Sequence, residues 1–176
     1  MSSRLILIAI LLFGFQSYCP AAPVKSAAAP ATLNPLATVM GSAGVSHCQG
    51  RVQQVTEFLT NGANSGATLL LPTDYLNDHL VSASLEVIDG PIVFYANVDF
   101  APLVAYGCDA SFESVVYWPD SCEKVAKVQF KEAKNTGKMR QQISVLTASS
   151  NNLQIFLMPA GNGCVSIKKQ AIFDRF

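Results

Sequence analysis

A hairpin signal in the middle of the chain constrains its fold most. Apolar and polar residues alternate along residues 81–87 and again along 92–100, and Asp89-Gly90 lies between the two stretches. A period of two places the apolar side chains on one face, as in a half-buried β-strand. Asp-Gly between two such runs favours a tight hairpin turn. We therefore expect two antiparallel strands here.

Further strands are expected toward the C-terminus. The stretches with strand-like patterns are 111–118, 141–148, 153–158 and 164–172. Ser-Ser-Asn-Asn and Pro-Ala-Gly-Asn-Gly separate the last three, which is typical of a meander with short turns. Residues 124–130 fit either a strand or a turn or two of helix, and both interpretations stay open. The loop spacings and the cysteines recur at no fixed period, so the sequence indicates no internal repeat.

A helix is expected ahead of the hairpin. Apolar residues at helical spacing form one stripe, and they are Val52, Val55, Phe58 and Leu59. Asn61-Gly62 follows, a common helix end. A second, short helix is expected at 74–80, with Thr73 as its N-cap. The sequence thus predicts an α+β or mainly β domain. In it the N-terminal helix packs on an antiparallel sheet, β-meander or sandwich-like, of about six to eight strands.

The N-terminus resembles an export signal. Eleven apolar residues, 5–15, follow Arg4, about half of the roughly 20 that a membrane-spanning helix needs. We interpret residues 1–21 as a signal peptide cleaved after Ala21. The alternatives are an uncleaved anchor and lipidation at Cys19, which the bulky Tyr18 disfavours. After cleavage no membrane span remains, and we expect an exported protein, periplasmic or extracellular.

Two segments follow the signal. Residues 22–45 are rich in Ala and Pro, which is typical of a flexible tether. Residues 46–176 have the length of one domain. Removal of Arg4 with the signal leaves eleven Lys and Arg residues against twelve Asp and Glu residues, a net charge of −1. A nearly neutral chain lacks the basic footprint of a nucleic-acid binder, so we expect no nucleic acid partner.

The cysteines predict two disulfides. Four remain after signal cleavage, an even number in an exported chain, and they allow three connectivities. Cys108 and Cys122 flank one strand-turn unit, whereas Cys48 and Cys164 lie near the two ends of the folded region. We therefore predict the nested pairing Cys48–Cys164 and Cys108–Cys122. The chain has no Cys-x-x-Cys pair, so neither a redox motif nor a zinc site is indicated.

The residues that could carry catalysis are few. His47 adjoins Cys48, but a cysteine with three potential disulfide partners is a poor candidate for a nucleophile. His79 lies near Asp78 in the expected short helix, which gives an alternative hypothesis of a small exported hydrolase. No motif for a metal or a cofactor is present. We therefore expect no enzyme activity, no cofactor and no metal.

Three aromatic residues are candidates for binding. Most aromatic residues between 94 and 118 alternate into one face and are expected in the core. Tyr95, Tyr117 and Trp118 could instead line a binding surface, where aromatic anchors are common. Trp118 precedes Pro119 in the loop that the predicted Cys108–Cys122 bridge would close. We therefore expect a non-enzymatic binding or inhibitory module that engages another protein through this loop. The alternatives are the hydrolase and a structural or assembly subunit of an envelope complex.

Overall fold

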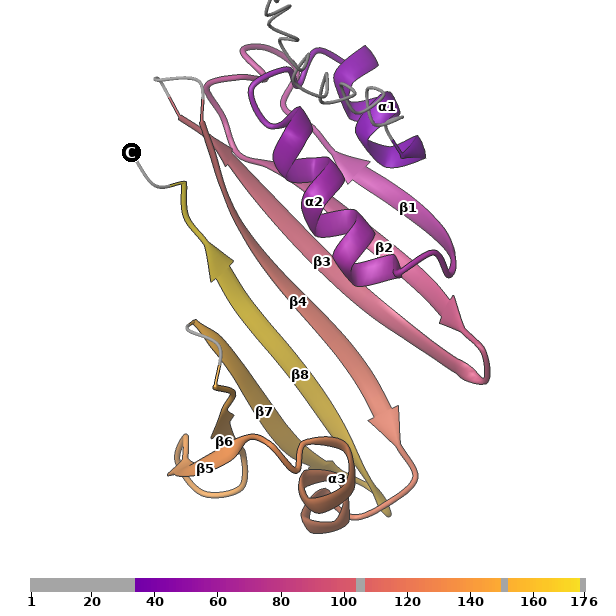
Figure 1. Cartoon of the computed structure of the whole chain (residues 1–176), viewed down its shortest axis with the longest axis vertical. Helices are drawn as coiled ribbons and strands as arrows, with labels where there is room; N and C mark the ends of the chain where they lie inside the picture. The colour runs from indigo at the N-terminus through magenta and orange to yellow at the C-terminus, as the bar shows by residue number, and fades with distance from the viewer. Residues whose placement is uncertain (1–33, 104–106, 150–151, 175–176) are drawn as a thin grey trace, which may run out of the picture. The chain divides into compact units, whose positions relative to one another are not determined.

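Eight antiparallel strands form one sheet in the computed structural model, which describes residues 34–103, 107–149 and 152–174 (Figure 1). The strands are β1 (Asn64–Leu70), β2 (Val81–Asp89), β3 (Ile92–Pro102), β4 (Cys108–Trp118), β5 (Lys134–Lys138), β6 (Ser144–Thr147), β7 (Leu153–Ala160) and β8 (Gly163–Ile172). The helices are α1 (Pro35–Ser42), α2 (Gln49–Thr60) and α3 (Cys122–Gln129). The predicted α+β class, with a helix packed before an antiparallel sheet and two disulfides, is confirmed.

The predicted hairpin is present. β2 and β3 pair antiparallel from Val81↔Phe100 to Asp89↔Ile92. Gly90 in the turn has φ 57°, a conformation that glycine adopts without strain. The helix predicted from the stripe at Val52 is α2, which ends at Asn61 in the left-handed conformation. The turn signal at Asp89-Gly90 and the helix-end signal at Asn61-Gly62 therefore predicted the hairpin and the end of α2 correctly.

Two predicted segments differ from the structure. The expected helix at 74–80 is a loop, because Tyr75 has φ 55° and cannot continue a helix. The Asn77 side chain accepts hydrogen bonds from the backbone N–H groups of Ser46 (2.9 Å) and His47 (3.0 Å), which hold the loop. Within the expected tether 22–45, residues 35–42 form α1. Its N-cap is Asn34, and Pro at the first helical position suits a helix start.

The predicted signal peptide at 1–21 and the first part of the expected tether lie outside the described residues. The end of that expected tether is instead part of the folded domain, because Ala37 and Met40 of α1 are fully buried. The ambiguous segment 124–130 is largely α3. Ser121 caps it, and a Glu123–Lys127 pair one turn apart supports it. The hydrogen bond and the positive charge of Lys127 lower the pKa of Glu123.

The domain follows the same plan twice, a similarity that the sequence did not indicate. α2 precedes the meander β1–β4, and α3 precedes the meander β5–β8. The strand order β1-β2-β3-β4-β8-β7-β6-β5 places the two fourth strands side by side and antiparallel. This is the arrangement that a local twofold axis between β4 and β8 would produce. The two helix-plus-meander units are called the first half and the second half below.

The disulfides follow the same plan and correct the predicted nested pairing. Cys48 bonds to Cys108, and Cys122 bonds to Cys164. Each bridge ties the start of a helix to the start of the fourth strand in the same half. The predicted Cys108–Cys122 bond is wrong because β4 runs straight between these residues. At about 3.3 Å per residue the strand separates them by roughly 30 Å, whereas a disulfide needs Cα atoms within about 7 Å.

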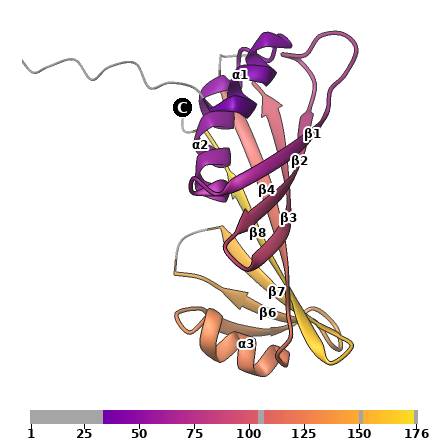
Figure 2. The ribbon, with the colours of Figure 1, turned by 90° about the vertical axis from the view of Figure 1, so that its right-hand side faces the viewer.

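Each half has its own buried cluster on the helix side of the sheet. The first lies under α1 and α2 and includes Phe100 and Phe112. The second lies under α3 and includes Val125, Ile155 and Leu157. In Figure 2 the three helices lie on the same side of the strands. The opposite side of the sheet therefore has no helix among the described elements.

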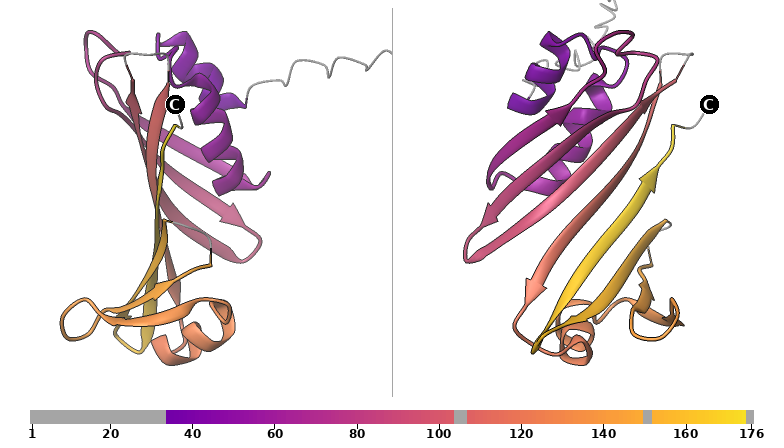
Figure 3. Two further views of the ribbon diagram at one scale, coloured as in Figure 1. Left: turned by 60° about the vertical axis from the view of Figure 1, so that its left-hand side comes forward. Right: turned by 180° about the vertical axis from the view of Figure 1, so that it is seen from behind.

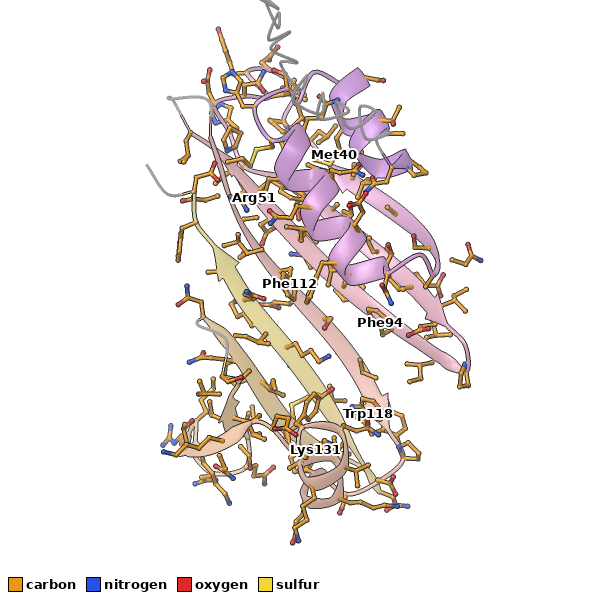
Figure 4. The ribbon with its side chains drawn as sticks, viewed as in Figure 1. Met40, Arg51, Phe94, Phe112, Trp118 and Lys131 are labelled. Carbon is orange, nitrogen blue, oxygen red and sulfur yellow. A yellow bond between two sulfur atoms is a disulfide. The ribbon has the colours of Figure 1, made fainter. Side chains whose placement is uncertain are left out.

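A partly buried cation joins α2 to the residues that follow β8. The Arg51 guanidinium pairs with the Asp174 carboxylate, and its Nε donates a hydrogen bond to the Cys108 carbonyl oxygen over 2.9 Å (Figure 4). The second oxygen of Asp174 accepts from the Cys108 backbone N–H over 2.6 Å. This network anchors the C-terminal residues that the structure describes beside the first disulfide.

We expect Arg51→Met to lower the free energy of unfolding by about 2 kcal/mol. Removing one partner of a buried pair costs about 3–5 kcal/mol, and the partial exposure of Asp174 reduces that figure. Urea denaturation measures the change. The matched control is Lys127→Met, whose pair with Glu123 is exposed to solvent, so this substitution should leave the free energy of unfolding nearly unchanged. Equal losses in the two variants would contradict the network.

Candidate functional site

The helix-free face of the sheet is the candidate site (Figure 3, right). Strand register decides which residues it carries, because side chains opposite one another in neighbouring strands share a face. Phe112 pairs with Val98 and is buried under the helices. Residues of the other parity, such as Val115 on β4 and Tyr95 on β3, lie on the helix-free face.

Apolar residues form a row across five strands of this face. In register from β3 to β6 they are Tyr95, Val115, Ile167, Phe156 and Val145. The adjacent row, toward the end of β4 and the start of β8, holds Tyr117, Val165 and Met158. Val93, two residues before Tyr95 on the same face of β3, adjoins this row. These nine residues are called the apolar band. It crosses the seam between β4 and β8 and therefore draws on both halves of the domain.

The next row along the strands is polar over all eight strands. From β1 to β5 it holds Thr68, Ser84, Asn97, Glu113, Lys169, Gln154, Thr147 and Lys134. Within it, Glu113 forms an ion pair with Lys169. In the row beyond, Ser82 hydrogen-bonds Asp99 over 2.7 Å. From β3 to β6 the helix-free face thus changes along one row boundary from a polar half to an apolar half, and on β2 the first apolar row continues with Glu86.

Several members of the apolar band are open to solvent. Tyr117 is 58% exposed, Val93 56% and Tyr95 48%. Scattered exposed apolar residues are normal on proteins, but contiguous patches mark interaction sites. The band is contiguous because eight of its members are direct cross-strand neighbours within the two rows, and Val93 lines the same hollow as Tyr117. It therefore has the composition and exposure of a binding surface.

A shallow hollow of about 710 Å³ lies over the band at β3 and β4. Its lining includes Val93, Tyr95, Val115, Tyr117 and Val165. The Tyr95 hydroxyl shares a hydrogen bond of 3.0 Å with the Ser84 hydroxyl, which fixes the ring at the border of the polar half. Glu86 is the charged residue on its rim. The hollow can accept an apolar side chain and offers two phenolic hydroxyl groups at its edges.

Gly163 allows the Tyr117 ring to lie along β8. A Cβ atom at this position would be 2.6 Å from the Tyr117 hydroxyl and closer still to the Trp118 carbonyl oxygen. Any larger residue would therefore displace the ring or the strand. Gly163, two residues before the Val165 that pairs with Tyr117, is thus part of what positions the exposed ring.

The structure brings together two of the three predicted binding residues. Tyr95 and Tyr117 line the same hollow, whereas Trp118 points to the helix side and packs with the cluster under α3 (Figure 4). Its Nε1–H donates a hydrogen bond of 2.8 Å to the buried Ser166 hydroxyl. The disulfide-held loop that was to present Trp118 does not exist, because Cys122 bonds to Cys164 instead. A direct role for Trp118 in binding stays a prediction.

No family model, curated protein or solved structure matches this chain.

The remaining candidate residues form no comparable site. Cys48 is in a disulfide, so it is no free thiol beside His47. His79 and Asp78 are exposed in the loop before β2, where His79 contacts the Tyr75 ring edge-on. Among the described residues, no three His, Cys, Asp or Glu side chains gather closely enough to hold a metal. The three described helices also lack the length and apolar character needed to cross a membrane.

The sequence did contain a signal for the missed members of the band. In residues 92–100 and 164–172, the alternate positions that would face solvent in a half-buried strand include Val93, Val165 and Ile167. A half-buried strand normally has polar residues there. Where apolar residues point to both faces of a strand near one of its ends, both faces are expected to contact other parts of the protein or a partner.

Proposed function

We propose that the protein is an exported, non-enzymatic binding module that holds a protein partner on the apolar band. The observation that carries the proposal is the division of the helix-free face, with one row polar over eight strands and the next apolar over five. The band supplies aromatic anchors, and the polar row supplies a hydrated rim. Interfaces have the same anatomy, an apolar centre with a polar border.

Export belongs to the same proposal. The two disulfides are consistent with an oxidising compartment, where such bonds persist. The signal-like residues 1–21 would direct the chain there, and the partner would be another exported or surface protein. The exposed positions of His79 and Asp78 support the non-enzymatic side of the proposal, because neither carboxylate nor imidazole is held in a cleft.

Two exposed residues on β7 provide a matched test. Met158 belongs to the band, and Gln154 lies four residues earlier on the same face in the polar row. A photo-crosslinking amino acid would replace each in turn in cells that make the protein. We expect one discrete crosslinked protein from position 158, the same product from position 117, and little or none from position 154. Mass spectrometry would identify the product.

Crosslinking that is equal at positions 154 and 158, or absent at 117 and 158, would contradict the proposal. Once the partner is known, Tyr117→Ala should weaken its binding by more than about 1 kcal/mol, the usual effect of truncating an anchor. The same substitution should leave the free energy of unfolding nearly unchanged, because Tyr117 is mostly exposed.

A further inference from the structure

The two edges of the sheet, β1 and β5, are built differently. Each has a strand neighbour among the described residues on one side only. An edge strand presents backbone N–H and C=O groups on its other side, where a strand of another chain can add. Natural proteins block such edges with lysines, prolines, bulges or short strands.

β5 carries several of these protective features. It has five residues, with Lys134 at its start and Lys138 at its end. Its pairing with β6 shifts register between Asn135 and Gly137. The Asn135 side chain accepts a hydrogen bond from the Gly137 backbone N–H over 2.9 Å, so part of the backbone is already occupied. This edge is poorly suited to pairing with another strand.

β1 lacks these features. Its seven residues, Asn64 to Leu70, pair with β2 in unbroken register and include no charge and no proline. The uncharged stretch extends over residues 58–73. All of β1 except Leu69 is exposed, and Leu70 is 75% exposed. A long, regular and uncharged edge is a ready template for strand addition.

A groove with an apolar wall lies on the helix side of β1. Its volume is about 740 Å³, and the apolar wall includes Pro35, Leu36 and Val39 of α1 together with Ala67 and Leu69 of β1. The rest of its lining is largely polar and includes Glu57 of α2. α1 contains no charged residue, and Val39 is 54% exposed. An added strand would thus gain apolar contacts with α1 as well as backbone hydrogen bonds.

We propose that two copies of the chain associate by antiparallel pairing of β1 with β1, centred on Ala67. The pairing is self-complementary, as a twofold interface requires. It places Ser65 opposite Leu69 and Asn64 opposite Leu70 of the other copy, so no charges meet. The same pairing of β5 about Thr136 would place Lys134 opposite Lys138, which is unfavourable.

The second copy also fits the groove. Ser65, Ala67 and Leu69 lie on the helix side of β1, since they are in register with the buried Val87, Leu85 and Ala83 of β2. In the pair, Leu69 of one copy would therefore face the groove beside α1 of the other. The proposal rests on this edge and not on the apolar band, which lies on the opposite face.

The test is the association state of the full mature chain, measured by sedimentation over a concentration series. We expect the wild-type protein to form dimers with a dissociation constant of roughly 10–100 μM or below, as interfaces of moderate size do. Ala67→Lys and Ala67→Glu should each raise the dissociation constant of the dimer at least tenfold, because like charges then meet at the axis. An equimolar mixture of the two variants should restore the dimer, which a misfolded variant could not do.

Three results would overturn the proposal. The first is a wild-type chain that stays monomeric over the whole range. The second is a dimer that Ala67→Lys leaves intact and Tyr117→Lys breaks, which would place the contact on the apolar band. The third is failure of the mixed variants to associate while circular dichroism shows both to be folded. Thr136→Lys on the other edge is the control and should leave the dissociation constant of the dimer unchanged.

Discussion

Replacing both Cys48 and Cys108 with alanine is expected to lower the free energy of unfolding by about 4 kcal/mol. The bond closes a loop with a sequence separation of 60, and chain entropy predicts about 4 kcal/mol for a loop of that length. Whole domains are stable by about 5–15 kcal/mol, so the variant would keep only part of its stability. Denaturant unfolding without reductant gives the value.

The second bridge provides the comparison. Its sequence separation is 42, so the Cys122→Ala, Cys164→Ala double variant should also lose about 4 kcal/mol. A loss below about 1 kcal/mol for either variant would contradict a stabilising role of that bridge. Peptide mapping under non-reducing conditions should link Cys48 with Cys108. Peptides that link Cys48 with Cys164 would instead support the nested pairing.

Trp118→Ala is expected to cost about 3 kcal/mol of unfolding free energy. Truncating a core aromatic costs about 3–5 kcal/mol, and the partial exposure of Trp118 places the effect at the lower end. The loss includes the hydrogen bond to Ser166, whose side chain is fully buried and would be left unsatisfied. Thermal and denaturant unfolding measure the change.

Two neighbouring substitutions separate the contributions. Trp118→Phe keeps much of the packing and loses the hydrogen bond, so we expect a smaller loss of about 1–2 kcal/mol. Tyr117→Ala removes an exposed ring of the opposite face and should change stability by less than about 0.5 kcal/mol. The emission of Trp118, the only tryptophan, should be blue-shifted. Red-shifted emission with free quencher access would contradict its packing under α3.

The elements found from the sequence are those whose signals are local. The alternation in β2 and β3 and the apolar stripe of α2 each arise within a few residues. β1 and β5 carry weaker signals, because β1 consists largely of small and polar residues and β5 has a lysine at each end. Their strand state depends on neighbours β2 and β6, so tertiary pairing overrides their weak propensity.

The candidate site shows the same limit. The prediction of Tyr95 and Tyr117 as binding residues rests on their aromatic character, which is local information. The continuous row needs the pairing of Val115 with Ile167 and of Ile167 with Phe156. Those registers join strands of both halves, and the first crosses the seam between β4 and β8. No periodicity within a single strand contains this information, so the band could be seen only after the sheet was assembled.

The placement of the bridges has a consequence for a cleaved chain. Each disulfide closes within its own half, and residues 119–121 alone carry the main chain from β4 to α3. A single proteolytic cut there would leave two fragments with no covalent link between the halves, each with its own disulfide and buried cluster. They would be held together by the ladder from Ala110↔Ile172 to Trp118↔Cys164, by the Trp118 ring and by the Arg51–Asp174 ion pair. We therefore expect two fragments that are produced separately to complement each other by noncovalent docking.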